Sequence, residues 1–387
     1  MAAASVFIDV GKQLRVYLWD RARALMIAES EQSVIVLLQC MILMTYEECP
    51  VRVEHRWLAM ATQQAQVLLC DQWTDAGDDE LLKRTVRCLL IRDTVLSLTK
   101  RSRCQVQLET PQQLVPLRYT TGRESVVHED IPSETEDEPC LALEKLCAIV
   151  RPVLDAAPGR PITGQNDGEL RLLLQYWAQR YAFDTRDADV AEVGNVKIHW
   201  TAVIGLWSLA VLTFFCNSAD ANSTSGVTTF RTHDTRLVAM AISISTTVHH
   251  KLYEEDLVRF LPSSSVSALI PITIAHLVNT TSEIQDICQQ STQKFYCCWQ
   301  VLHDLRKRYG LAAAAMSRID SLGQQLRRKM DTAQAEQTKR LQERTRSICT
   351  FNPEMEQIEV STTSTDDEHW LALVSEPEQI LNSEMEC

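Results

Sequence analysis

Residues Glu254 to Asn279 read EEDLVRFLPSSSVSALIPITIAHLVN, and this stretch carries two helix signals separated by a break. Pro262 ends the first helix, because proline lacks the backbone donor that a continuing helix needs. Ser263 to Ser265 are typical capping residues, so we expect them to begin a second helix. The apolar residues of that helix recur at helical spacing, which predicts that it is buried. They are Val266, Leu269, Ile270, Ile274, Leu277 and Val278.

Pro271 lies in the middle of this second helix. An interior proline costs roughly 3 kcal/mol in an ordinary helix, so we expect a kink that packing stabilises. The stretch contains no nucleophile paired with a base, no metal-ligand spacing and no glycine-rich phosphate loop. The stretch therefore predicts a buried helix but indicates no catalytic, metal-binding or phosphate-binding site.

Helical patterns dominate the rest of the chain as well. One amphipathic face recurs through Leu237, Ala241, Ile244, Val248 and Leu252. The chain has 387 residues, is 45% hydrophobic and contains only 11 glycines, so it can bury a core as one large domain or two packed halves. We expect an all-α fold, a large helical domain with an acidic loop and a disordered acidic C-terminal tail.

Residues 198–219 form an apolar segment that contains no Asp, Glu, Lys or Arg. A segment of this length could cross a bilayer, whose core needs about 20 residues. Trp200, Ser208, Asn217 and Ser218 favour a helix buried in protein instead. If the segment serves as an anchor, the protein is a helical membrane-tethered or scaffold protein. This is the alternative to the function that the rest of the sequence indicates below.

Charge is distributed unevenly and locates the linkers. Residues 124–138 contain seven acidic residues and no basic one, and residues 347–387 contain ten acidic residues and no basic one. Without these two segments the formal net charge of −13 becomes +4. We expect a solvated loop and tail there, and a further linker at 217–229.

The composition divides the chain into five parts. Two helical parts of one domain, residues 1–122 and 140–322, flank an acidic linker at 123–139. A basic helical extension at 323–348 and the acidic tail at 349–387 follow.

The basic extension is a candidate for nuclear import or for contact with nucleic acid. Its candidate import residues are Arg327, Arg328, Lys329, Lys339 and Arg340. A solvated helix face is the alternative, because acidic residues such as Asp331, Glu336 and Glu343 lie between the basic ones.

The tail mixes acidic residues with apolar ones between Asp366 and Leu381. This composition is typical of activation segments that bury apolar anchors in a coactivator groove. We expect Trp370, Leu371 and Leu373 to be the anchors. An inert solvated tail is the other interpretation.

Five segments resemble, in order, the regulatory domain of fungal zinc-cluster transcription factors, known as the middle homology region. They are DRARALMIAESEQSVIVLLQCMIL (20–43), HRWLAMATQQAQ (55–66), KRTVRCLLIRDTVLSLTKRSRC (83–104), the stretch at 254–279 and CCWQVLHDLRKRY (297–309). The cutinase transcription factor subgroup is the most similar. Its structural motif residues fall at Arg92, Asp93, Leu257, Arg259, Phe260, Pro262 and Pro271. The chain departs from the pattern at Val86 and Arg87, where relatives carry two tryptophans, and at 99–103.

The resemblance implies a nuclear regulator of RNA polymerase II transcription for a metabolic or biosynthetic pathway. It implies that the partners are the transcriptional machinery or another transcription factor, with a homodimer or heterodimer possible and no membrane. It also implies a zinc cluster with Cys-x-x-Cys pairs, which none of the 13 cysteines forms. We therefore expect no cofactor in this chain, and only weak or indirect contact with DNA.

The remaining cysteines and histidines give no sign of catalysis. No secretory leader pattern begins the chain, so we expect reduced cysteines, with Cys40, Cys88 and Cys298 buried as small hydrophobic residues. No hydrolase or metalloprotease motif is present. We expect His249 and His250 to lie on the surface, and we expect no enzyme activity.

Overall fold

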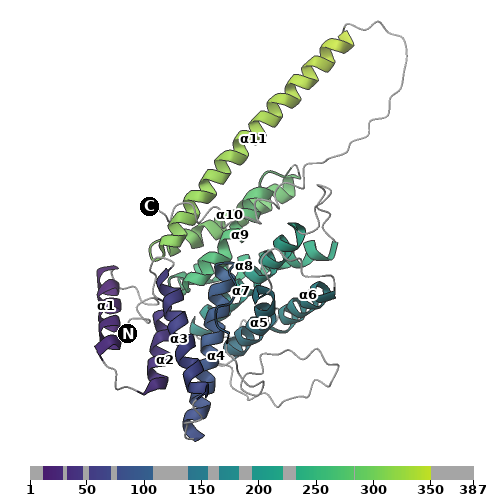
Figure 1. Ribbon diagram of the computed structural model, residues 1–387. Helices are drawn as coiled ribbons and strands as arrows, with labels where there is room; N and C mark the ends of the chain where they lie inside the picture. The colour runs from purple at the N-terminus through teal and green to yellow at the C-terminus, as the bar shows by residue number, and fades with distance from the viewer. Residues whose placement is uncertain are drawn as a thin grey trace.

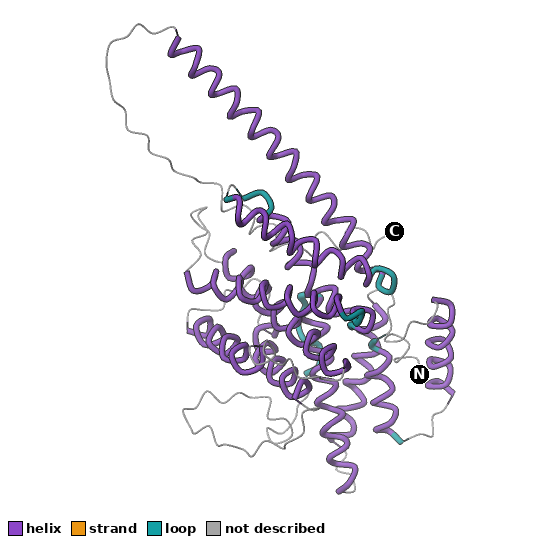
Figure 2. The backbone as a smooth tube through the Cα atoms, turned by 180° about the vertical axis from the view of Figure 1, so that it is seen from behind, coloured by secondary structure: helices purple, strands orange, loops and turns teal. Residues whose placement is uncertain are grey.

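The computed structural model describes residues 12–28, 33–46, 52–70, 76–107, 138–155, 165–182, 194–220, 232–282 and 284–349. Within these ranges the chain forms eleven α-helices and no strand, which confirms the all-α prediction (Figure 2). The acidic linker, apart from its last residues, and the acidic tail beyond residue 349 lie outside the described residues.

The helices follow one another along the chain and pack into a single helical body (Figure 1). The first five are α1 (Lys12–Ala28), α2 (Val34–Met44), α3 (Arg52–Cys70), α4 (Ala76–Thr99) and α5 (Glu138–Asp155). The others are α6 (Gln165–Trp177), α7 (Gly194–Asp220), α8 (Thr232–Glu254), α9 (Ser263–Asn279), α10 (Gln285–Leu305) and α11 (Gly310–Cys349). A π-helical turn (Ala178–Ala182) continues α6, and a 3-10 turn (Val258–Phe260) precedes α9.

Helix α9 is the central helix of the second half, and it packs against α7, α10, α11 and α4. Nearly every side chain from Ser265 to His276 is buried, as the apolar pattern predicts. The capping prediction is wrong in detail: Ser263 is already helical, and Pro262 takes the N-cap position without a side-chain bond. The helix continues across Pro271, because the contacts on all sides offset the cost of the missing donor.

Helix α7 is a core helix of the body. By length and composition it could cross a membrane, but 78% of its apolar window within Gly194–Phe214 is buried in the structure. Trp207 stacks on Trp177 with 5.9 Å between ring centroids, and its indole N–H donates to the Leu174 carbonyl at 3.1 Å. Because α7 runs to Asp220, the linker predicted at 217–229 begins later than expected.

Helix α11 leaves the body. Its first turns pack Ala312, Ala315, Met316 and Ile319 into the core beside α9 and α10. Its side chains become largely exposed after residue 323, and the helix projects away from the other ten (Figures 1 and 2).

A charge placed inside α7 tests the burial of this helix. We expect Leu209→Arg, at a position only 3% exposed, to lower the free energy of unfolding by about 3 kcal/mol or more. Urea denaturation followed by circular dichroism measures the change. His199→Arg, on the exposed side of the same helix, is the matched control and should change stability by less than about 0.5 kcal/mol. Equal stability of the two variants would show that α7 is not a core helix.

Candidate functional site

The Asp93 carboxylate is fully buried in α4 and joins three parts of the body. Oδ1 accepts the backbone N–H of Gln105, and Oδ2 accepts that of Val106, both at 3.0 Å. Arg151 of α5 completes the site, with Nη2 3.1 Å from Oδ2. Because buried charge is tolerated only where it is paired and hydrogen-bonded, these contacts fix residues 101–107 and α5 against α4.

The neighbouring Arg92 turns to the other side of α4. Its Nε donates to the Thr45 hydroxyl at 2.9 Å, and Nη2 donates to the Thr45 carbonyl at 2.6 Å. The guanidinium also lies 3.8 Å from the ring centroid of Tyr46, a cation–π contact. Arg92 therefore holds the end of α2, while Asp93 holds α5.

The partners of this pair were missed by the sequence analysis. Arg151 interrupts the apolar run of α5, as Arg92 and Asp93 interrupt that of α4. An isolated charge inside an apolar helix is the signal that could have identified it. Arg151 also donates to Thr94 Oγ1 at 3.1 Å and to the Val106 carbonyl. Thr45 offers no comparable signal.

The turn between α8 and α9 anchors the start of α11. Leu257 and Phe260 pack against the core, whereas Arg259 lies exposed with its guanidinium 5.0 Å from the Phe260 ring centroid. The next carbonyl, that of Leu261, accepts the Tyr309 hydroxyl at 2.7 Å. Tyr309 directly precedes α11, so the predicted motif turn positions the base of the projecting helix.

A seam of polar side chains lies buried between α7, α8, α9 and α10. His249 is fully buried, so its predicted surface position is wrong, while His250 is partly exposed beside Glu254. His249 Nδ1 donates to the Ser245 carbonyl at 2.8 Å, which leaves Nε2 as an acceptor without a hydrogen-bond partner among the described residues. Burial lowers the pKa of His249 to about 4.

The second histidine of the seam, His276, contacts the hydroxyl of Thr246 at 2.9 Å through Nε2. That hydroxyl donates to the Ile242 carbonyl, so the imidazole is the donor to Thr246. Burial, and to a smaller extent Lys294, lower the pKa of His276 to about 4. Cys298 also donates to Thr246, at 3.8 Å, and burial raises its pKa to about 12.

The seam is therefore uncharged at neutral pH, with neutral imidazoles and a protonated thiol. A thiol in this state is a poor nucleophile and a poor metal ligand. Across the described ranges, no group of three or more His, Cys, Asp or Glu side chains could hold a metal ion. Of the cysteines predicted to be buried, Cys298 is buried, Cys40 is partly buried and Cys88 is exposed.

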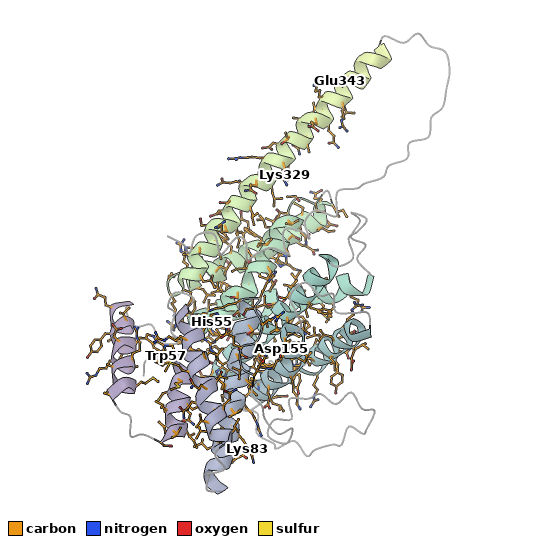
Figure 3. All side chains as sticks on the ribbon, viewed as in Figure 1. His55, Trp57, Lys83, Asp155, Lys329 and Glu343 are labelled. Carbon is orange, nitrogen blue, oxygen red and sulfur yellow. The ribbon has the colours of Figure 1, made fainter. Side chains whose placement is uncertain are left out.

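The predicted import residues share one exposed helix. Arg327, Arg328, Lys329, Lys339 and Arg340 all lie exposed on the part of α11 beyond the body, where Figure 3 labels Lys329. The part of α11 that carries them projects away from α4 (Figure 1). The activation anchors Trp370, Leu371 and Leu373 lie outside the described residues.

No protein-family model, curated protein or solved structure matches this chain. The resemblance to the zinc-cluster regulatory domain therefore stays a prediction that rests on the quoted segments.

We expect Asp93→Asn to lower the free energy of unfolding by about 3 to 5 kcal/mol. The amide keeps only one acceptor oxygen, so its NH2 would face at least one backbone N–H, and Arg151 would lose its buried negative partner. Asp155→Asn is the matched control, because Asp155 is exposed and also lies near Arg151, 3.9 Å from its Nε. The control substitution should lower the free energy of unfolding by less than about 1 kcal/mol. Urea titrations that rank the two variants equally would contradict the role of Asp93.

The seam predicts a pH dependence of stability. The unfolded chain binds a proton at each histidine below about pH 6.5, whereas folded His249 and His276 bind one only near pH 4. The free energy of unfolding is therefore highest above pH 6.5. It falls as the pH drops toward 4, by at most about 3 kcal/mol for each histidine.

Urea denaturation at pH 7, 6 and 5 measures this slope. The double variant His249→Gln with His276→Gln should show a smaller change of the free energy of unfolding with pH. The control His199→Gln, at an exposed position, should show the same change as the unmodified protein. An unchanged slope in the double variant would exclude the seam as its source.

Proposed function

We propose that this chain is the helical regulatory domain of a transcriptional regulator of the fungal zinc-cluster type, without the DNA-binding cluster. The supporting observation is that the segments that carry the resemblance pack into one body. Arg92 and Asp93 join α2, α4 and α5, and the turn at 257–262 holds the base of α11.

The regulator acts through protein partners, namely the transcriptional machinery or another transcription factor, in RNA polymerase II transcription. Its basic groups on α11 lie exposed, as recognition by an import receptor requires, and they direct the protein to the nucleus. Contact of the same groups with DNA would be limited to phosphates, so it would be weak and sensitive to salt.

The membrane-anchored alternative is less well supported. Most of α7 packs against α8 and α9, so a bilayer could receive it only after the core had opened. An enzyme is also less well supported, because the buried histidines and Cys298 are uncharged at neutral pH and hydrogen-bond mainly to hydroxyl and carbonyl groups.

A tethered reporter assay tests the proposal. We expect the full chain, fused to a heterologous DNA-binding domain, to drive transcription above that domain alone. Trp370→Ala with Leu373→Ala should reduce the reporter signal several-fold, because the anchors that bury in a coactivator are lost. Asp366→Asn with Asp367→Asn is the matched control and should reduce it less. A fusion that is inactive although nuclear and folded would refute the activation function.

A further inference from the structure

Helix α2 is uncharged, but the body does not enclose it. It reads VIVLLQCMILM, in which Gln39 is the one residue that is not hydrophobic. Among the described helices, only α2 and α9 contain no Asp, Glu, Lys or Arg. No residue of α9 is exposed, as expected for an uncharged helix that other helices surround. Helix α2 packs against α3 and α4, whereas its opposite side is open.

The open side of α2 is an apolar stripe. Val36, Cys40 and Leu43 follow one another at steps of four and three, so they share one side of the helix. Val36 is 41% exposed and Leu43 is 50% exposed, while Cys40 is partly buried. We name these three residues the open face. Figure 1 shows α2 at the edge of the body nearest α1.

The chemistry of the open face restricts what can cover it. None of its three side chains can pair with a charged group, and a charge removed from water without a partner costs free energy. An acidic or basic surface is therefore a poor occupant. The surface that covers the open face must itself be apolar and uncharged over about two helical turns.

A second copy of this chain carries such a surface. In a two-fold contact the same patch faces itself, so residue i of one copy meets residue j of the other, and j meets i. Antiparallel pairing of two α2 helices about a point near Cys40 brings Val36 of each copy close to Leu43 of the other. The large side chains then cover both ends of the contact. The smaller Cys40 side chains meet in the middle, where the two helices approach most closely.

We propose that the open face of α2 is a homodimer contact, formed with α2 of a second copy of this chain in antiparallel orientation. The contact goes beyond the proposed function and does not depend on it, because self-association requires only the apolar stripe. An 11-residue helix is about 16 Å long, and one of its sides buries less than the about 800 Å² per partner of a standard interface. The dimer is therefore reversible, with a dissociation constant on the order of micromolar.

Sedimentation equilibrium of the full chain tests the dimer, over concentrations from about 1 to about 100 μM that bracket a micromolar dissociation constant. We expect the mean mass to rise from that of one chain to that of two and then to stop, because a two-fold contact closes on itself. A chain that remains monomeric, or one that continues into larger assemblies, would overturn the proposal.

Paired glutamate variants locate the contact. Val36→Glu with Leu43→Glu should weaken the association at least about tenfold, because like charges would face one another across the dimer. Leu172→Glu with Tyr176→Glu is the matched control on α6, where the two side chains are 66% and 52% exposed, and it should leave the association unchanged. Circular dichroism shows that each variant is folded. Equal effects of the two pairs, or a dimer that survives the first pair, would reject the open face as the contact.

Oxidation of Cys40 tests the orientation of the two helices. A disulfide requires Cα atoms within about 7 Å of one another, so it reports which residues meet at the centre of the contact. We expect copper phenanthroline in air, with oxygen as the oxidant, to join the two Cys40 thiols and give a covalent dimer on a non-reducing gel. Peptide mass spectrometry identifies the linked residues.

Cysteine variants provide the controls for this oxidation. Cys40→Ser should abolish the covalent dimer, and Cys88→Ser, at an exposed cysteine of α4, should preserve it. A covalent dimer that persists in Cys40→Ser and disappears in Cys88→Ser would place the contact on another helix. Such a result would overturn the antiparallel pairing of α2.

Discussion

The carboxylate of Asp93 is the contact on which the arrangement of the body depends. A fully buried negative charge needs partners, and it takes them from backbone amides at 105 and 106 and from Arg151 of α5. Its neighbour Arg92 takes partners from the end of α2, on another side of the same helix. Two adjacent charges of opposite sign thus bind different neighbours, so α4 is held between α2 and α5 in one rotation about its axis. Apolar packing alone would fix the rotation of α4 about its axis less strictly than these two charged contacts do.

Patterns within one helix were predictable from the sequence, and partners between helices were not. The all-α class, the buried side of α9 and the buried α7 all follow from local spacing and composition. Arg92 and Asp93 were named as structural motif residues through the family resemblance, but their partners, Thr45 and Arg151, are 47 and 58 residues away along the chain. An isolated charge in an apolar run marks Arg151 as a candidate, but nothing local in the sequence pairs it with Asp93.

His249 illustrates how residue type misleads when periodicity is correct. It follows Ala241 and Ser245 at steps of four and precedes Leu252 by three, so its position belongs to the buried face of α8. The polarity of a His-His pair favoured the surface instead. The protein accepts the buried imidazole because Nδ1 bonds the Ser245 carbonyl and the ring stays neutral. Position on the helix was the better guide, since a neutral histidine costs much less to bury than a charged one.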